Sequence, residues 1–227
     1  MNVAIDLPML NTAMYTPLQL SLITVSAVSW FVMIATVLRG IRRHGAIEIP
    51  AAAAAANLAW ATVWGLLNRT DLGGLFVGAN AVALLLAMII FGYVLKHGAR
   101  HLKLAEVRRW FTPGLLVSYV FWLWLLFLFV RQGNDTPNGL LSGFIVSVFM
   151  SSLYVAIELS DIEPNQYSLL AGWAKLAANG CATAFCFITY PANHFLLTLC
   201  VITVVLDALY LRLFRERRLA APSPASP

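Results

Sequence analysis

The stretch Leu72–Lys96, LGGLFVGANAVALLLAMIIFGYVLK, decides the fold class of this chain. It continues from Leu72 as far as Lys96 before it meets a charged side chain. An α-helix needs about 20 mostly apolar residues to cross the hydrocarbon core of a bilayer. The stretch therefore predicts a transmembrane helix.

The composition extends this prediction to the whole chain. Hydrophobic residues make up 60% of the 227 residues and charged residues 11%, and the mean hydropathy is +0.79. Soluble domains carry about a quarter charged residues, so this chain has too little polar surface to form a soluble globule. The net charge of +5 does not indicate a nucleic-acid partner, because the basic residues lie between apolar runs. Membrane lipid is the expected partner.

Seven apolar runs of this kind follow one another, which predicts an all-α fold, an integral membrane bundle of seven transmembrane helices. The runs are 17–39, 49–67, 72–96, 113–131, 138–159, 168–190 and 194–214. Residues 1–219 are expected to form one transmembrane domain. The segment 220–227 is rich in Pro, Ser and Ala, and it is expected to be a disordered tail. Pro50 and Pro113 lie at run ends, where a helix can begin.

The basic residues predict the orientation, because Lys and Arg accumulate on the cytoplasmic side of membrane proteins. Of the 15 basic residues, 12 follow the first, third and seventh runs. They are Arg39, Arg42, Arg43, Lys96, Arg100, Lys103, Arg108, Arg109, Arg212, Arg215, Arg217 and Arg218. With seven spans these three segments lie on one side, so the N-terminus is expected outside and the C-terminus in the cytoplasm. The localisation expected is a multi-pass protein of the bacterial inner membrane or the endoplasmic reticulum.

Polar side chains inside the apolar runs are the candidate functional residues, because an ionisable group in hydrocarbon is costly. Lys175 and Asp207 lie within the sixth and seventh runs, and Asn57 lies at a similar depth in the second. Tyr93 and Tyr210 lie nearer the cytoplasmic edge. This distribution predicts a ligand pocket that opens toward the cytoplasmic leaflet. A structural alternative is that Lys175 and Asp207 form an interhelical ion pair and that Asn57 makes an interhelical hydrogen bond.

The order of these residues resembles the small seven-span terpene cyclases of meroterpenoid and indole-diterpenoid biosynthesis. Five segments carry the resemblance along most of the chain: Val28–Trp30 with the basic loop after it, Asn57–Trp60, Tyr93–Gly98, Gln166–Lys175 and Leu206–Tyr210. Each motif alone is weakly specific, and together they are moderately specific. Two positions depart from the family pattern, since Ala61 and Ala87 stand where acidic residues are expected.

The resemblance implies cyclisation of a prenyl chain, initiated by protonation of an epoxide or alkene, with no metal and no cofactor. Asp207 then corresponds to the general acid. The resemblance, together with the polar residues within the runs, implies a substrate site made of Asn57, Trp60, Trp64, Tyr93, Lys175 and Tyr210. The substrate implied is a lipophilic prenylated small molecule, and a prenyltransferase and an epoxidase are implied as pathway partners.

Three other functions fit a bundle of this size. A non-catalytic membrane subunit would explain the missing acids at Ala61 and Ala87. A small solute transporter would require an internal repeat and helix breakers in the middle of spans, whereas the prolines here lie near run ends. A retinal-binding photoreceptor is suggested by the buried lysine, but the lysine that binds retinal in microbial rhodopsins lies in the seventh span and Lys175 lies in the sixth.

Overall fold

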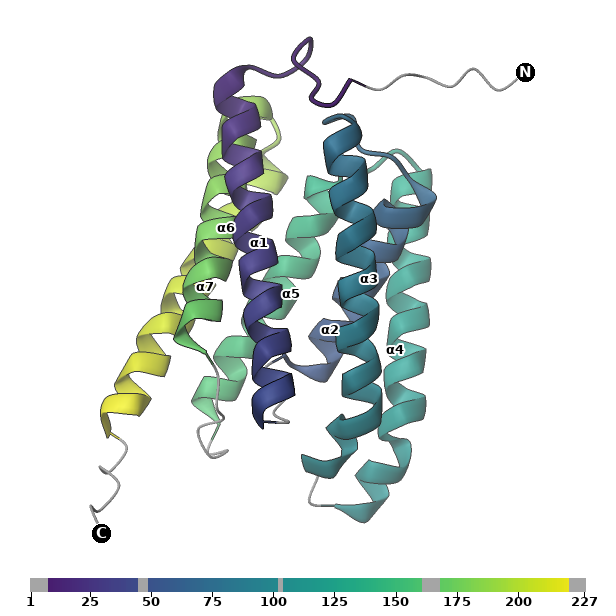
Figure 1. The fold of residues 1–227 in the computed structure, drawn as a ribbon, viewed down its shortest axis with the longest axis vertical. Coiled ribbons are helices and arrows are strands. Elements are labelled where there is room, and N and C mark those ends of the chain that lie inside the picture. Colours follow the sequence, from purple (N-terminus) through teal and green to yellow (C-terminus); the bar gives the residue numbers. More distant parts are fainter. Residues whose placement is uncertain (1–7, 45–48, 102–103, 161–167, 221–227) are drawn as a thin grey trace.

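The computed structural model describes residues 8–44, 49–101, 104–160 and 168–220. These residues form helices and turns and contain no strand, which confirms the all-α prediction (Figure 1). The elements are α1 (Pro17–His44), α2 (Ala51–Thr62), the π-helical turn η1 (Val63–Leu67), α3 (Gly74–His97), the 3-10 turn η2 (Gly98–His101), α4 (Ala105–Arg131), α5 (Leu140–Leu159), α6 (Leu169–Thr189) and α7 (His194–Ala220).

Five helices in the described residues are long and apolar enough to cross a membrane, namely α1, α3, α4, α5 and α7. These five helices confirm the prediction of a multi-pass membrane protein. The helix α6 is 21 residues long, but Lys175 and Asn179 lower its hydropathy. The apolar segment Ala51–Leu67, formed by α2 and η1, is shorter than the five spans.

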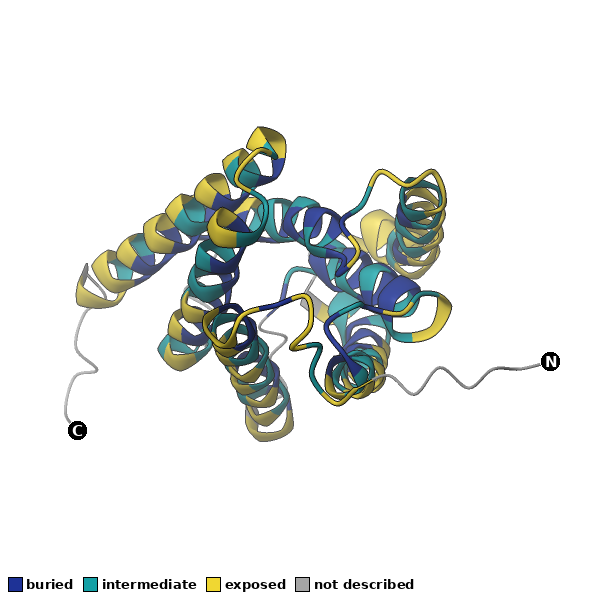
Figure 2. Ribbon diagram, turned by 90° about the horizontal axis from the view of Figure 1, so that it is seen from above, coloured by how far each residue is buried: buried dark blue, intermediate teal, exposed yellow. Residues whose placement is uncertain are grey.

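Most of the helices form a ring when the bundle is viewed from above (Figure 2). Helix α6 packs against α1 and α7, and α7 packs against α5. Helix α2 connects this group to the rest of the bundle, because it contacts α3, α4 and α5. By contrast, α1 and α3 contact each other over a short stretch. The bundle is therefore least tightly closed between α1 and α3.

Small residues allow α2 to occupy this crowded position. Ala53, Ala54, Ala55 and Ala56 are all buried, so this part of α2 packs closely on every side. Helices in lipid associate through van der Waals contact, and small side chains let their backbones approach closely. Gly172 has the same role in α6, since a Cβ there would lie 2.7 Å from a side-chain carbon of Leu211.

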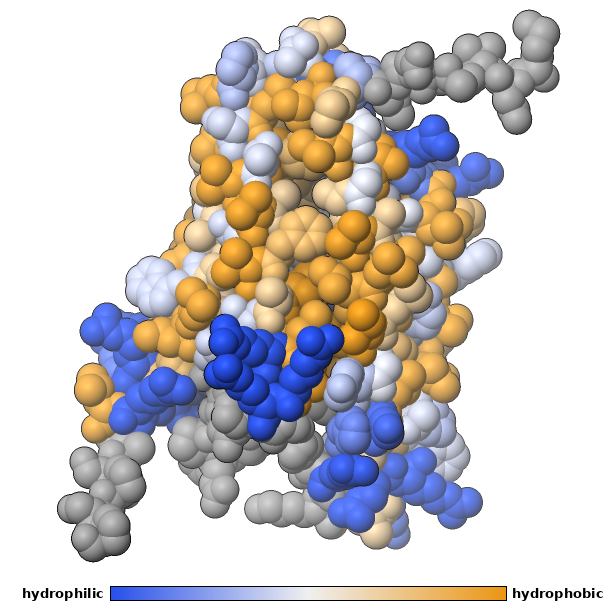
Figure 3. Space-filling model, in the orientation of Figure 1, coloured by the Kyte–Doolittle hydropathy of each residue, from blue (hydrophilic) through white to orange (hydrophobic). Residues whose placement is uncertain are grey.

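The face of the bundle drawn in Figure 3 is mostly apolar in its middle, and hydrophilic residues gather toward its ends. Large side chains such as Trp110, Phe121 and Trp124 of α4 are more than half exposed. Exposed apolar side chains are expected where the surrounding solvent is lipid. The C-terminal ends of α1, α3 and α7 and the N-terminal end of α4 lie at the same end of the bundle (Figure 1). The basic residues of those segments are therefore concentrated at that end.

Three helix boundaries differ from the sequence prediction by five residues or more. Helix α1 continues past the predicted end at residue 39 as far as His44. Helix α4 begins at Ala105, and Pro113 lies inside it rather than at its start. Helix α7 continues through its basic residues as far as Ala220, the first residue of the predicted tail. Hydropathy marks where the chain leaves hydrocarbon, but a helix can continue into the interface, where water satisfies its backbone. Lys103, residues 166–167 of the family motif and residues 221–227 of the predicted tail lie outside the described residues.

Candidate functional site

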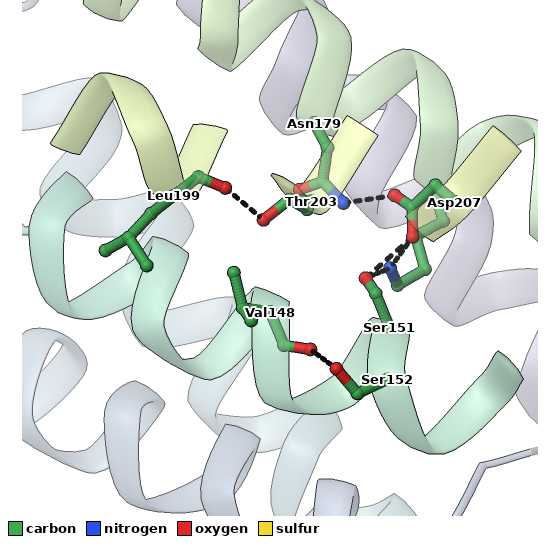
Figure 4. Close-up of polar contacts among 8 residues, drawn as sticks. Val148, Ser151, Ser152, Asn179, Leu199, Thr203 and Asp207 are labelled. Carbon is green, nitrogen blue, oxygen red and sulfur yellow. Dashed lines mark hydrogen bonds and ion pairs between the residues drawn. The ribbon is translucent and has the colours of Figure 1, made fainter. Parts of the chain in front are cut away.

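Four polar side chains from three helices meet in the interior of the bundle. Asp207 lies in the middle of α7, Lys175 and Asn179 lie one turn apart on α6, and Ser151 lies on α5. Lys175 and Asp207 form an ion pair, and Ser151 Oγ donates a hydrogen bond to Asp207 Oδ1 at 2.7 Å. Asn179 Nδ2 donates to Asp207 Oδ2 at 2.6 Å. Figure 4 shows Ser151 and Asn179 pointing at the carboxylate from different sides.

This cluster satisfies both charges within the bundle. Lys175 is 3% exposed and Asp207 is 2% exposed, so neither charge is screened by water. The ammonium group of Lys175 donates to Asp207 Oδ1 and to Ser151 Oγ. A buried charge is tolerated when it is paired and its remaining hydrogen-bonding capacity is used. The interhelical ion pair considered from the sequence is present, and it ties α5, α6 and α7 together.

A cavity of about 160 Å³ lies next to this cluster, between α1, α2, α3, α5 and α6. It occupies the half of the bundle that contains the N-terminal ends of α1, α3 and α5. The sequence predicted a pocket in the opposite half, around Lys175, Asp207 and Tyr210. The cavity there, beside Lys175 and Tyr210, has a volume of about 10 Å³.

Aromatic and apolar side chains make up most of the cavity wall. The aromatic members are Trp30, Phe31, Trp60, Phe76 and Phe144. On α1 the lining extends from Ile23 to Phe31, which corresponds to about 12 Å along the bundle axis at about 1.5 Å per residue. An apolar cavity of about 150 Å³ is large enough to hold benzene. The cavity therefore fits a slender apolar group rather than a bulky ring system.

Polar groups without partners also line the cavity. Ser26, Asn57, Asn80 and Ser147 come from four different helices, and their side chains have no hydrogen-bond partner among the described residues. All four side chains are partly exposed, so their polar groups are accessible to a molecule that supplies hydrogen bonds inside the cavity.

A second polar network closes the cavity at the end near the N-terminus. Tyr15 Oη donates to Asp71 Oδ2 at 2.6 Å, and Asn138 Nδ2 donates to Tyr190 Oη at 2.8 Å. Asn138 lines the cavity, and its Oδ1 is buried without a partner in the described part of the chain. Burial and the hydrogen bond to Asp71 raise the pKa of Tyr15 above its ordinary value. Burial raises the pKa of Tyr190 to about 12.

Asp135 holds the start of α5 at the same end of the bundle. Its Oδ1 accepts hydrogen bonds from the backbone N–H groups of Thr136 at 2.8 Å and Ser142 at 3.1 Å. Its Oδ2 is buried, with no partner in the described residues. Burial raises the pKa of Asp135, and the hydrogen bonds from Ser142 and Thr136 oppose this shift in part. The capping interaction therefore includes a carboxyl group that is poorly solvated in the folded state.

The structure brings some of the sequence-predicted site residues to the cavity and places others elsewhere. Asn57 and Trp60 line the cavity. Trp64 instead packs on Gly139, and its Nε1 donates to Ser142 Oγ at 3.2 Å.

The remaining candidates lie outside the cavity. Tyr93 stacks on His97, and Tyr210 packs on Tyr154. Lys175 and Asp207 do not line the cavity, and Asn179, which does, lies between Asp207 and the cavity.

Asn80, Asn179 and Asn138 were not among the site residues predicted from the sequence. Asn80 and Asn179 lie within apolar runs, as Asn57 does, so the rule that identified Asn57 would have found them too. Asn138 could not be found in this way, because it lies at the start of a run, where a polar residue is ordinary.

Comparison with known proteins identifies no relative: no protein-family model, curated protein or solved structure matches this chain. The resemblance to seven-span terpene cyclases therefore depends on the motif residues alone. Among the described residues, no group of three His, Cys, Asp or Glu side chains could hold a metal ion.

Proposed function

We propose that the chain crosses the membrane seven times, with its N-terminus outside and its C-terminus in the cytoplasm. Seven α-helices in the described residues support this count, with α6 and the shorter α2–η1 segment as the two additional spans. The concentration of basic residues at one end of the bundle supports the orientation. Reporter fusions at the two termini test it: a cytoplasmic N-terminus, or termini on the same side, would contradict the proposal.

We also propose that the cavity binds a lipophilic prenylated molecule, which the protein cyclises. The observation that carries this proposal is an aromatic cavity inside a membrane bundle, lined by four polar side chains without partners among the described residues. An apolar chain fits among Trp30, Phe31 and Trp60. An epoxide oxygen at the end of the prenyl chain can hydrogen-bond to Asn57 or Asn80, while a phenol or indole ring on the same molecule stays outside the cavity.

The substrate would reach the cavity from the bilayer, between α1 and α3. These two helices make little contact with each other, yet both contribute to the cavity wall. The molecular surface is hollowed between their upper parts (Figure 3). A lateral opening suits a substrate that is already dissolved in lipid.

The proposed chemistry uses the Lys175–Asp207 pair as the proton source. A proton passes from the Lys175 ammonium to the Asp207 carboxylate, which leaves a neutral amine and a neutral acid. When the Asn179 side chain turns away from Asp207, the acid donates its proton to the epoxide oxygen or alkene carbon, and ring closure produces a carbocation. Loss of a proton from the cation to the neutral amine of Lys175 returns the pair to its starting state, so the overall reaction is an isomerisation.

The cavity wall would support this reaction in two ways. The faces of Trp30 and Trp60 can stabilise a developing cation, because the face of an aromatic ring carries partial negative charge. The apolar wall also excludes water, which would otherwise capture the cation before ring closure.

The test is an assay for cyclised product in membranes supplied with an epoxidised prenyl phenol or indole. The double variant Lys175→Met/Asp207→Asn removes the proton source and leaves an amide that can still hydrogen-bond with Ser151 and Asn179. We expect it to fold, to bind substrate and to form no product. Full activity in this variant would remove Asp207 from the mechanism. The variant Tyr93→Phe, distant from the cavity, serves as the control that keeps wild-type activity.

A non-catalytic membrane subunit that binds the same class of molecule is the second candidate. The observation that favours it is that both oxygens of Asp207 are engaged by Lys175, Ser151 and Asn179. In addition, Ala61 and Ala87 are buried in the apolar core, where the resembling family has acids. Substrate binding without product in wild-type membranes would select this candidate over the cyclase.

A further inference from the structure

A groove of about 390 Å³ lies on the outer surface between α6 and α7, away from the central cavity. It lies near the C-terminal end of α7, where Figure 3 shows hydrophilic side chains beside apolar ones. Its apolar wall includes Trp173, Leu176, Ala208 and Leu211, and its polar end includes Arg212 and Arg215. The groove thus combines a hydrocarbon surface and a cationic end within one depression.

The cationic end has an incomplete set of partners. Arg212 Nε donates to Glu216 Oε1 at 2.9 Å, and both side chains are more than half exposed. Arg215 has no hydrogen-bond or ion-pair partner among the described residues. Two guanidinium groups therefore share one carboxylate, and the end of the groove retains a net positive charge.

The two parts of the groove match the dimensions of a lipid at a membrane interface. Ala208 and Arg215 are seven residues apart, or about 10 Å along the helix. Trp173 is 50% exposed beside the apolar part, and tryptophan is enriched where hydrocarbon meets the headgroup layer. With Trp173 at this boundary, the arginines lie at the level of the lipid phosphates. Leu176 and Leu211 then lie at the level of the first methylene groups.

We propose that this groove binds an anionic phospholipid, with its phosphate between Arg212 and Arg215 and one acyl chain along Trp173 and Leu211. Basic pockets between transmembrane helices on the cytoplasmic side recognise anionic headgroups in this way. The continuity of the apolar wall with the lipid-facing surface selects a lipid over a free anion. This site shares no lining residue with the central cavity, so it does not depend on the cyclase proposal.

Native mass spectrometry of the full chain in detergent, titrated with phosphatidylglycerol or phosphatidylcholine, tests the proposal. We expect the wild type to retain phosphatidylglycerol in preference to phosphatidylcholine. Each basic residue near an anionic lipid contributes about fivefold in affinity, so Arg212→Gln/Arg215→Gln should weaken phosphatidylglycerol binding roughly thirtyfold. The matched control Arg42→Gln/Arg43→Gln removes two exposed charges from the same end of the bundle on α1, and it should bind as the wild type does.

A second variant tests the apolar part of the groove without changing any charge. Ala208→Phe fills the space beside Leu211, and we expect it to reduce phosphatidylglycerol retention while the arginines remain. Equal binding of the two lipids, an equal loss in the α1 control, or full competition by glycerol phosphate without acyl chains would each overturn the proposal. Circular dichroism of every variant establishes that the helices are intact before binding is compared.

Discussion

Replacing Lys175 with methionine removes one charge of a buried pair and keeps most of the apolar stem of the side chain. The carboxylate of Asp207 then remains 2% exposed, with hydrogen bonds from Ser151 and Asn179 but no cation beside it. Removing one partner of a buried ion pair lowers the free energy of unfolding by about 3–5 kcal/mol. Both side chains are almost completely buried, so solvent screening does not reduce this figure.

The double variant Lys175→Met/Asp207→Asn removes the uncompensated charge. The amide that replaces the carboxylate keeps one carbonyl oxygen, which can still accept a hydrogen bond from Ser151 or Asn179. We therefore expect a loss of less than about 2 kcal/mol. The two changes are far from additive, as expected for residues in direct contact.

Reversible unfolding in mixed micelles, followed by tryptophan fluorescence, measures these free energies. The exposed pair Arg212–Glu216 on α7 provides the control, and Glu216→Gln should leave the free energy of unfolding unchanged within the error of the measurement. A loss of less than about 1 kcal/mol in Lys175→Met alone would refute the assignment of a buried ion pair. A double variant no more stable than that single variant would refute it as well.

Three further predictions concern the rest of the bundle. Gly139→Ala places a Cβ 2.4 Å from an indole carbon of Trp64 at a φ of +79°, so thermal unfolding should show that the protein loses at least about 3 kcal/mol of stability. Gly133→Ala, at a φ of +74° in open space, should lose about 1 kcal/mol of stability. Equal losses in the two variants would contradict the packing of Gly139 against Trp64. Ala83→Phe fills the central cavity and should abolish binding of a radiolabelled prenyl phenol. The control Ala81→Phe, on the exposed side of α3, should bind the probe as the wild type does. Unchanged binding in both variants would exclude the cavity as the binding site. Because burial raises the pKa of Asp135, the folded state holds that proton more tightly than the unfolded chain does. The contribution of Asp135 to stability should therefore be fully present below about pH 4 and should be lost as the pH rises through the folded pKa. In pH-dependent unfolding, Asp135→Asn should remove this loss, and an unchanged slope would contradict the assignment.

The sequence predicted the helices well because their apolar runs follow directly from the need to satisfy the backbone in lipid. The runs 138–159 and 168–190 differ by one or two residues from α5 and α6. Pro113 was misleading, because it lies inside α4 and the helix continues on both sides of it. The basic extension of α7 could not be recognised from hydropathy, since charged residues are equally compatible with a loop.

The site was predicted less completely, because a depth along each helix does not say which way a side chain points. Lys175 and Asp207 were correctly placed at similar depths, but whether they faced each other or a cavity depended on the rotation of α6 and α7. Trp60 and Trp64 lie one turn apart on adjoining helical segments, yet Trp60 lines the cavity and Trp64 packs on Gly139. Such differences arise from tertiary packing, which a single sequence does not encode in any local pattern.

Photo-crosslinking tests the central claim, that the cavity holds a prenyl chain, most directly. Membranes containing the protein are irradiated with a geranyl probe that carries a diazirine, and the labelled residues are identified by mass spectrometry. If the cavity is the binding site, adducts form on cavity residues such as Phe31 and Phe76, and they are lost in Ala83→Phe. Adducts confined to outward residues such as Phe121, unchanged in that variant, would contradict the claim.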